Sequence, residues 1–150
     1  MKELTWFEPG EPVEAEEIGS AEKRLDVKFP PDYAQVVALH SGASNPDQCE
    51  FEYQDGGRKK VGNFGTLLSV QEAHPDNLFD AIENLGDQLP AGILPVVDTG
   101  SGDCVCLDYR KSAVPSVAYF VHERTGESAI VPLANTFAEF LNLLKEPDDE

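Results

Sequence analysis

The segment richest in groups that could do chemistry is the loop Gly100-Ser101-Gly102-Asp103. Closely spaced glycines can cradle a phosphate, and a serine between glycines can serve as a nucleophile. The loop lacks the lysine of a phosphate-binding loop and the third glycine of a dinucleotide fingerprint. Thr99 and Asp103 stand where a serine nucleophile elbow needs its outer glycines. We therefore interpret the loop as a tight turn between strands, and we expect Asp103 to bond its backbone amides.

Two short motifs have part of the spacing of a metal or redox site. His122-Glu123 begins like the zinc motif of a metalloprotease, but Gly126 occupies the position of the required second histidine. Cys104 and Cys106 are separated by one residue, whereas redox and zinc-knuckle motifs separate their cysteines by two. We interpret both cysteines as core residues, and we expect no metal ion and no cofactor.

Carboxylates beside the same loop could hold a divalent cation, because Asp98, Asp103 and Asp108 follow one another closely. On an extended strand, however, Asp103 and Asp108 face opposite sides and lie roughly 16 Å apart. A shared metal ion is therefore not expected. The histidines occupy unrelated contexts without a nearby nucleophile: they are His40, His74 and His122. The sequence thus predicts a protein that is not an enzyme.

The charge balance is strongly acidic, with 28 acidic and 11 basic side chains in 150 residues and a net charge of −17. Such a charge repels phosphate backbones, which argues against direct nucleic-acid binding, and it attracts basic protein partners. The alternative is that the charge only keeps the protein soluble. No signal peptide is visible, and no apolar stretch approaches the roughly 20 residues of a membrane span. With 3 cysteines, an odd number, the sequence predicts reduced thiols in a cytoplasmic protein without membrane contact.

Two apolar runs must position the glycine loop, and they predict a strand, a tight connection and a second strand over Leu94–Tyr109. Pro95 cannot donate a ladder hydrogen bond, so we expect it at a strand start or a sheet edge. In the second run, Val105 and Leu107 face one side and Cys104 and Cys106 the other. Both faces are apolar, which favours a strand covered on both sides.

Helical spacing appears in four further segments. The first helix begins near Val13 and ends at Phe29-Pro30-Pro31, because a residue before proline is pushed out of the helical region. The second starts at Pro31, lies antiparallel to the first and stops at Gly42. The third covers 76–86 with Asp76 as a possible cap, and the last follows a cap at Asn135 or Thr136 and buries Phe137, Phe140, Leu141 and Leu144.

Short strands are predicted between these helices. They cover 49–53 and 58–61, joined by a turn at 55–57, and also 65–70, 117–121 and 129–131. The chain therefore divides into a lead-in (1–12), one domain (13–145) and an acidic tail (146–150) that should fray. In the lead-in, Trp6 and Phe7 are expected to pack back on the domain.

Three motifs, in this order, resemble the Smi1/Knr4 family, also called the SUKH superfamily. The first combines Ile18-x-x-Ala-Glu22-x-x-Leu25, Phe29-Pro30-Pro31-Asp32-Tyr33 and Ser41-Gly42. The second runs from Leu94-Pro95-Val96 through Gly102-Asp103 to Leu107-Asp108-Tyr109. The third combines Pro115-x-Val117 and His122 with Leu133-Ala134-x-Thr136-Phe137-x-x-Phe140-Leu141. Phe29 and Thr136 are conservative departures from the family pattern.

The resemblance implies an α+β fold, a single domain with helices packed around a mostly antiparallel sheet. It also implies a non-enzymatic, protein-binding role. Many bacterial members are immunity proteins that neutralise toxin domains, often nucleases, and the strong negative charge suits a basic partner of this kind. The alternative is a regulatory or scaffolding module in cell-wall synthesis or signalling, as in eukaryotic relatives.

The residues expected to bind the partner are exposed acids beside the sheet: Glu50, Glu52, Asp55 and Asp98. The residues that match family motifs are expected to be structural: they are Glu22, Pro30, Asp32, Tyr33, Gly42, Gly102, Asp103, Asp108 and Phe137. Of these, Asp32 is predicted to hold the start of the second helix.

Overall fold

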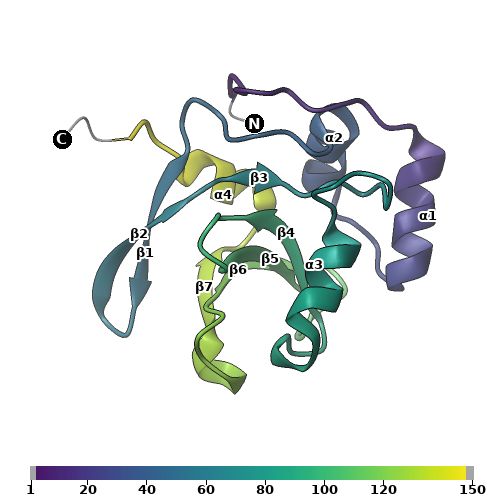
Figure 1. Ribbon diagram of the computed structural model, residues 1–150. Helices are drawn as coiled ribbons and strands as arrows, with labels where there is room; N and C mark the ends of the chain where they lie inside the picture. Colours follow the sequence, from purple (N-terminus) through teal and green to yellow (C-terminus); the bar gives the residue numbers. More distant parts are fainter. Residues whose placement is uncertain (1–2, 148–150) are drawn as a thin grey trace.

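The central hairpin that the glycine loop closes is present in the computed structural model, which describes residues 3–147. Strands β4 (Ile93–Asp98) and β5 (Cys104–Asp108) pair antiparallel on either side of the loop. They form the middle of a five-stranded antiparallel sheet of order β3-β4-β5-β6-β7 (Figure 1). The other members are β3 (Thr66–Leu67), β6 (Ser116–Phe120) and β7 (Ile130–Ala134). The predicted α+β fold with a mostly antiparallel sheet is confirmed.

Both faces of β5 are covered, as the apolar runs predict. Val105 and Leu107 belong to the larger core, which the helices share. Cys104 and Cys106 point to the opposite face and join a smaller buried cluster with Phe120. Because the strand is buried on both sides, its apolar residues run without polar alternation.

Pro95 does not lie at a strand start or in an edge strand, so that prediction is wrong. It lies inside β4, opposite Cys106, where the register between β4 and β5 shifts. β3 pairs only with the last two residues of β4, Val97 and Asp98. The missing N–H is thus tolerated because the strand is irregular at this point and β3 does not reach it.

Helices α1 (Ala15–Leu25) and α2 (Pro31–His40) form the first architectural unit, and Pro31 occupies the first turn of α2 as predicted. The prolines do not end α1, however. Asp26 adopts the left-handed conformation (φ 56°), and its N–H returns to the carbonyls of the last turn. The helix therefore stops at Leu25, before the Phe29-Pro30 step is reached.

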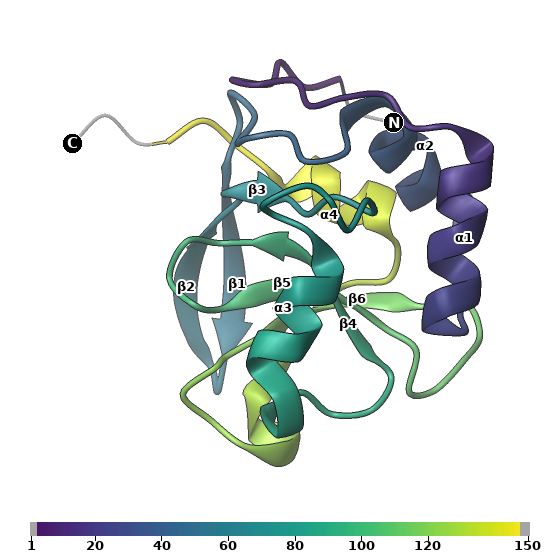
Figure 2. The same ribbon diagram turned by 45° about the vertical axis from the view of Figure 1, so that its right-hand side comes forward.

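Helix α3 (Leu78–Leu85) lies along β4, and α4 (Phe137–Leu143) packs against α2 and β7 (Figure 2). Asn77, not Asp76, caps α3, because its side chain accepts from the amide of Asp80. Thr136 caps α4 by accepting from the amide of Glu139, as predicted. Short 3-10 turns follow α3 (Gly86–Gln88) and precede β7 (Gly126–Ala129).

Strands β1 (Glu50–Asp55) and β2 (Arg58–Asn63) form a separate two-stranded sheet that projects from the body of the molecule (Figure 1). One face of the hairpin packs inward: the ring of Phe51 lies 5.2 Å from that of Phe140, and Tyr53 stacks on Tyr119 at 4.5 Å. Aromatic contacts therefore fix the base of the hairpin.

The lead-in packs back through one of its two aromatic residues. Trp6 stacks on His40 at 5.0 Å, but Phe7 is 79% exposed, so the prediction for Phe7 is wrong. The amide of Phe7 is held by the carbonyl of Asn45, and extended backbone then directs neighbouring side chains to opposite sides. Of the predicted tail, only Glu146 and Pro147 lie within the described residues, and both are exposed.

Candidate functional site

The thiols of β5 are unsuited to nucleophilic chemistry. Burial, reinforced by the charges of Asp98 and Asp103, raises the pKa of Cys104 to about 12. Burial likewise raises the pKa of Cys106 well above its usual value. A thiol reacts as its thiolate, so both cysteines serve packing, as predicted. Among residues 3–147, no group of three or more histidine, cysteine or acidic side chains is placed to hold a metal ion.

The glycine loop is held by Asp98 instead of Asp103. Asp98 accepts from the amide of Gly100 at 2.9 Å, and the Thr99 hydroxyl bonds to the Asp103 carbonyl at 2.8 Å. The prediction that the Asp103 side chain bonds the loop amides is therefore wrong. Gly100 and Gly102 have φ values of 86° and 99°, which explains the choice of glycine at both positions.

Asp103 instead ties the start of β5 to the end of β6. One carboxylate oxygen accepts from the amide of His122 at 2.9 Å and contacts its Nδ1 at 2.5 Å. The other accepts from the Tyr119 hydroxyl at 2.9 Å. Gly102 completes the arrangement, because a Cβ there would lie 2.8 Å from the His122 ring.

The Asp103–His122 pair has the form of an acid–base dyad but lacks a nucleophile. No hydroxyl or thiol bonds the imidazole among the residues that the structure describes. Burial opposes ionisation of Asp103, but the His122 amide, the imidazole and the Tyr119 hydroxyl together hold its pKa below the usual value. This arrangement suits a structural clamp.

Two of the predicted binding acids, Asp55 and Glu52 of the β1–β2 hairpin, already form ion pairs within the protein. The Asp55 side chain is only 9% exposed and accepts bidentate bonds from Arg124 at 2.9 and 2.7 Å. Asp55 also accepts a hydrogen bond from Lys60 at 2.8 Å. The bonds from Arg124, and to a lesser extent the bond from Lys60, hold the pKa of Asp55 far below its usual range. The expectation that Asp55 is an exposed acid is therefore wrong. Glu52 is exposed but bonds Lys145 at 2.9 Å.

The remaining two candidates lie apart from the hairpin pairs. Glu50 exchanges both backbone hydrogen bonds with Lys145, while its side chain stays partly exposed. Asp98 lies at the far end of β4, partly exposed, with one oxygen bound to the loop. The four predicted acids therefore do not form one acidic patch.

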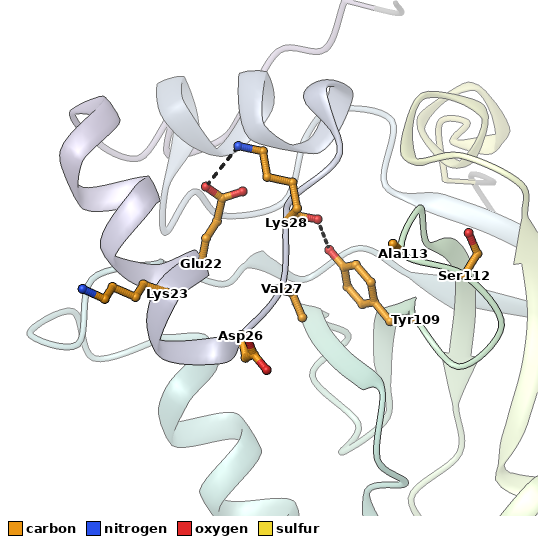
Figure 3. A pocket seen from close by; sticks show the side chains of 8 residues that line it. All are labelled: Glu22, Lys23, Asp26, Val27, Lys28, Tyr109, Ser112 and Ala113. Carbon is orange, nitrogen blue, oxygen red and sulfur yellow. Dashed lines mark hydrogen bonds and ion pairs between the residues drawn. The ribbon is translucent and has the colours of Figure 1, made fainter.

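Glu22 stands at the wall of a hollow of about 540 Å³ between the end of α1 and the loop after β5 (Figure 3). Its carboxylate accepts from the amide of Phe29 at 2.6 Å and lies 4.0 Å from the Lys28 ammonium. Across the hollow, the Tyr109 hydroxyl donates to the carbonyl of Lys28 at 2.8 Å (Figure 3). The lining includes two acids and two lysines, so the hollow has no net charge to select an ionic ligand.

The other motif residues form contacts within the fold. Asp32 accepts from the amide of Tyr33 at the start of α2 and, with its second oxygen, from the amide of Ala138 in α4. Asp108 is bound by the backbone and guanidinium of Arg110. Burial opposes its ionisation, yet Arg110 keeps the pKa of Asp108 below its usual value.

Three more motif residues shape the helix ends and the core. Pro30 precedes α2 in the extended conformation that starts the helix. Gly42 has φ 79°, and a Cβ there would lie 2.5 Å from the His74 ring. Phe137 is buried, with its ring 5.2 Å from that of Tyr33.

Twelve other acids lie in the lead-in, α1, α3 and the loops that flank α3, and of these only Glu22 and Glu72 form ion pairs within the described residues, with Lys28 and Arg24. Residues 3–22 contain seven acidic residues and residues 71–92 contain five, and neither segment contains lysine or arginine. The two segments lie together: Gln71 bonds Glu17, and Arg24 bridges to Glu72 at 2.9 Å. We call this surface, formed by 3–22 and 71–92, the acidic face. Local spacing did not reveal it, because the two segments meet only in the fold.

An apolar groove of about 570 Å³ borders this face, between the lead-in and helices α2 and α4. Leu4 and Trp6 form one side, and Val36, Leu39 and Leu141 form the other. Leu39 is 61% exposed, although Tyr33, Val36 and Val37 of the same helix are buried. The groove can hold an apolar side chain of a protein partner.

Comparison with known proteins gives a match to a protein family. The model of the SMI1 / KNR4 family (SUKH-1) matches residues 12–143, which is most of the chain. A search of the curated proteins found no match. Within the described part of the chain, no helix has the length and apolar character needed to cross a bilayer.

Proposed function

Because the chain belongs to the SMI1/KNR4 family (SUKH-1) and is a SUKH-type protein-binding domain, we propose that it is an immunity protein. It binds a basic toxin domain, of nuclease type, and neutralises it in the cytoplasm of a bacterium that meets competing cells. The protein acts by binding and carries out no reaction of its own. The two buried thiols of β5 and the closed Asp103–His122 clamp are consistent with this role.

The observation that carries the proposal is the acidic face. It places twelve carboxylates on two adjacent segments that contain no lysine or arginine. A nuclease that binds a phosphate backbone presents a basic surface, and the acidic face is complementary to it. At low salt, such complementarity speeds association by orders of magnitude and orients the partner before contact.

The apolar groove supplies the apolar contact that charge complementarity alone does not provide. Stable protein interfaces combine a desolvated apolar centre with a polar rim. Leu39 and Trp6 line the groove, and Glu3 lies at its edge. A partner that places an apolar anchor here and basic side chains over the acidic face is held by both effects, and its access to nucleic acid is blocked.

The test is co-expression with the toxin domain encoded beside this chain. We expect relief of toxicity and a stable complex, and we expect Leu39→Glu to lose both while keeping its folded spectrum. Leu143→Glu, another exposed leucine of a helix, is the matched control and should still protect. Absence of any adjacent toxin that binds, or capture of housekeeping proteins of the cell envelope instead, would overturn the proposal.

A further inference from the structure

Strand β2 has one side whose backbone groups are not used by the fold. The amide of Phe64 bonds to the carbonyl of Cys49, which fixes the hydrogen-bonding phase of the hairpin. In an antiparallel pair, bonded positions alternate with positions whose groups point outward. The groups of Lys59, Val61 and Asn63 therefore point away from β1, and they have no backbone partner within residues 3–147.

The other sheet edges are protected. The outer side of β1 is closed where Glu50 exchanges two hydrogen bonds with Lys145. β7 carries Pro132, which has no N–H to offer, and β3 is only two residues long. β2 has six residues, no proline and a regular register along its whole length. An edge of this kind is a template for an added strand.

The charge of β2 selects the strand that can be added. Arg58, Lys59 and Lys60 are consecutive, and β2 contains no acidic residue. The carboxylates that face them are shared, since Glu52 also binds Lys145 and Asp55 also binds Arg124.

Without counting Lys145, four cations (Arg58, Lys59, Lys60 and Arg124) lie on or against the hairpin beside the carboxylates of Glu52 and Asp55. Arg58 has no ion pair in the described part of the chain. The result is a local positive surplus on a protein of net charge −17. A second copy of the chain would bring a further −17 and another basic β2, so self-pairing is opposed at long and short range.

We propose that β2 binds an extended, acid-bearing segment of a partner protein by strand addition. The segment exchanges main-chain hydrogen bonds with Lys59, Val61 and Asn63. Its acidic side chains reach Lys59 on one face of the hairpin and Arg58 and Lys60 on the other, because side chains alternate along β2. The half-exposed Val61 side chain provides an apolar contact. This surface is separate from the acidic face and does not depend on the immunity role.

The probe is a short synthetic peptide, Thr-Glu-Glu-Val-Thr-Glu-Glu-Val-Thr with blocked ends, which presents glutamates on both faces of an extended strand and is titrated into the ¹⁵N-labelled protein. At about 0.15 M salt the Debye length is about 8 Å, so the local surplus acts while the distant acidic face is screened. We expect shifts and slowed hydrogen exchange at the amides of Lys59, Val61 and Asn63. The amides of Lys60 and Gly62, which already bond to β1, should keep their exchange rates.

Val61→Pro removes one outward N–H without removing a bond to β1 and should weaken peptide binding about tenfold or more. Val61→Ala keeps the N–H and should bind within about threefold of the native chain. If Val61→Pro fails to fold, the pair Arg58→Glu and Lys59→Glu carries the test, since it should lose the acidic peptide and gain a lysine version of it.

Four results would overturn the proposal. They are no binding of the acidic peptide, shifts that map away from β2, equal binding of the lysine peptide at β2 of the native chain, and a dimer formed through β2 without peptide. None of them bears on toxin neutralisation, so the two proposals fail separately.

Discussion

The Asp32 carboxylate at the start of α2 accepts a hydrogen bond of 2.9 Å from the amide of Ala138, 106 residues later in the chain. Its other oxygen bonds the neighbouring amide of Tyr33 at 2.8 Å. The amide of Ala138 lies in the first turn of α4, where a helix cannot supply its own acceptor. One carboxylate therefore serves the first turns of two helices and fixes α4 against α2.

Replacement of Asp32 should consequently weaken two helix starts at once. Asp32→Ala leaves both amides without an acceptor, and we expect a loss of about 1–2 kcal/mol in the free energy of unfolding. Asp32→Asn keeps one acceptor oxygen and should lose less. Urea unfolding followed by circular dichroism measures both variants. Equal stability of Asp32→Ala and the native chain would show that the bond to Ala138 contributes nothing.

The buried hydroxyl of Tyr33 gives a prediction of the opposite sign. It has no hydrogen-bond partner within the described structure, although Tyr33 is fully buried. Burying an unpaired hydroxyl costs about 1–3 kcal/mol, so Tyr33→Phe should stabilise the protein by about 1 kcal/mol. Tyr109→Phe is the matched control, because its hydroxyl donates to Lys28 and its loss should destabilise. A melting temperature above that of the native chain for Tyr33→Phe and below it for Tyr109→Phe would support the prediction. The reverse ordering would refute it.

Asp103 should make stability depend on pH in the acid range. Its pKa is lower in the folded protein, because the bonds from His122 and Tyr119 outweigh the opposing effect of burial. The stabilisation is complete above the unfolded pKa of about 3.9 and is lost as the pH falls through the lower folded value. The difference in unfolding free energy between the native chain and Asp103→Asn should thus be constant from about pH 5 to 7 and shrink below about pH 4. A difference that stays constant down to pH 3 would contradict this.

The same hydrogen bonds predict that Asp103→Ala loses stability first and partner binding only as a consequence. Asp103→Ala leaves the Tyr119 hydroxyl and the His122 amide without their acceptor and should cost about 1–3 kcal/mol. Partner binding should weaken only as the folded fraction falls. An Asp103→Ala protein with an unchanged melting temperature but no partner binding would show that Asp103 contacts the partner itself.

The three cysteines should differ in reactivity. Cys104 and Cys106 are buried with raised pKa values, whereas Cys49 is partly exposed and burial raises its pKa less. A thiol reagent at about pH 8 should modify at most one cysteine in the folded protein and all three after denaturation. Cys49→Ser should abolish the reaction of the folded state. Rapid modification of this variant would mean that the sheet opens around β5.

Local pattern was sufficient for elements that neighbouring residues determine. Alternation and turn residues predicted both hairpins, and helical spacing with a Thr136 cap predicted α4. Element ends were less accurate where a single residue decided them, as with the left-handed Asp26 that ends α1. Propensity does not identify such a residue, because residues other than glycine rarely take this conformation, although aspartate takes it more often than most.

Side-chain partners far apart in the chain could not be predicted. Asp55 was expected to be an exposed acid, but it is enclosed by Arg124, 69 residues away. Asp98 has the loop-holding role predicted for Asp103, because the side chain of Asp103 bonds His122 at the end of β6 instead. The sequence identifies a carboxylate, but its hydrogen-bond partner, far away in the chain, becomes its neighbour only in the folded protein.

The proposed acidic face predicts that the position of charged residues affects the rate of association with the partner more than the net charge does. Glu83→Lys with Asp87→Lys changes the net charge from −17 to −13 within the face. Glu123→Lys with Glu146→Lys makes the same change outside it, and all four side chains are exposed. Stopped-flow mixing with the toxin domain at low salt should show association slowed about tenfold or more for the first pair and by less than about threefold for the second.

Both effects should disappear at about 1 M salt, where the Debye length is about 3 Å, while dissociation rates change little. Equal slowing by the two pairs would mean that net charge alone draws the partner in and that the acidic face has no directing role.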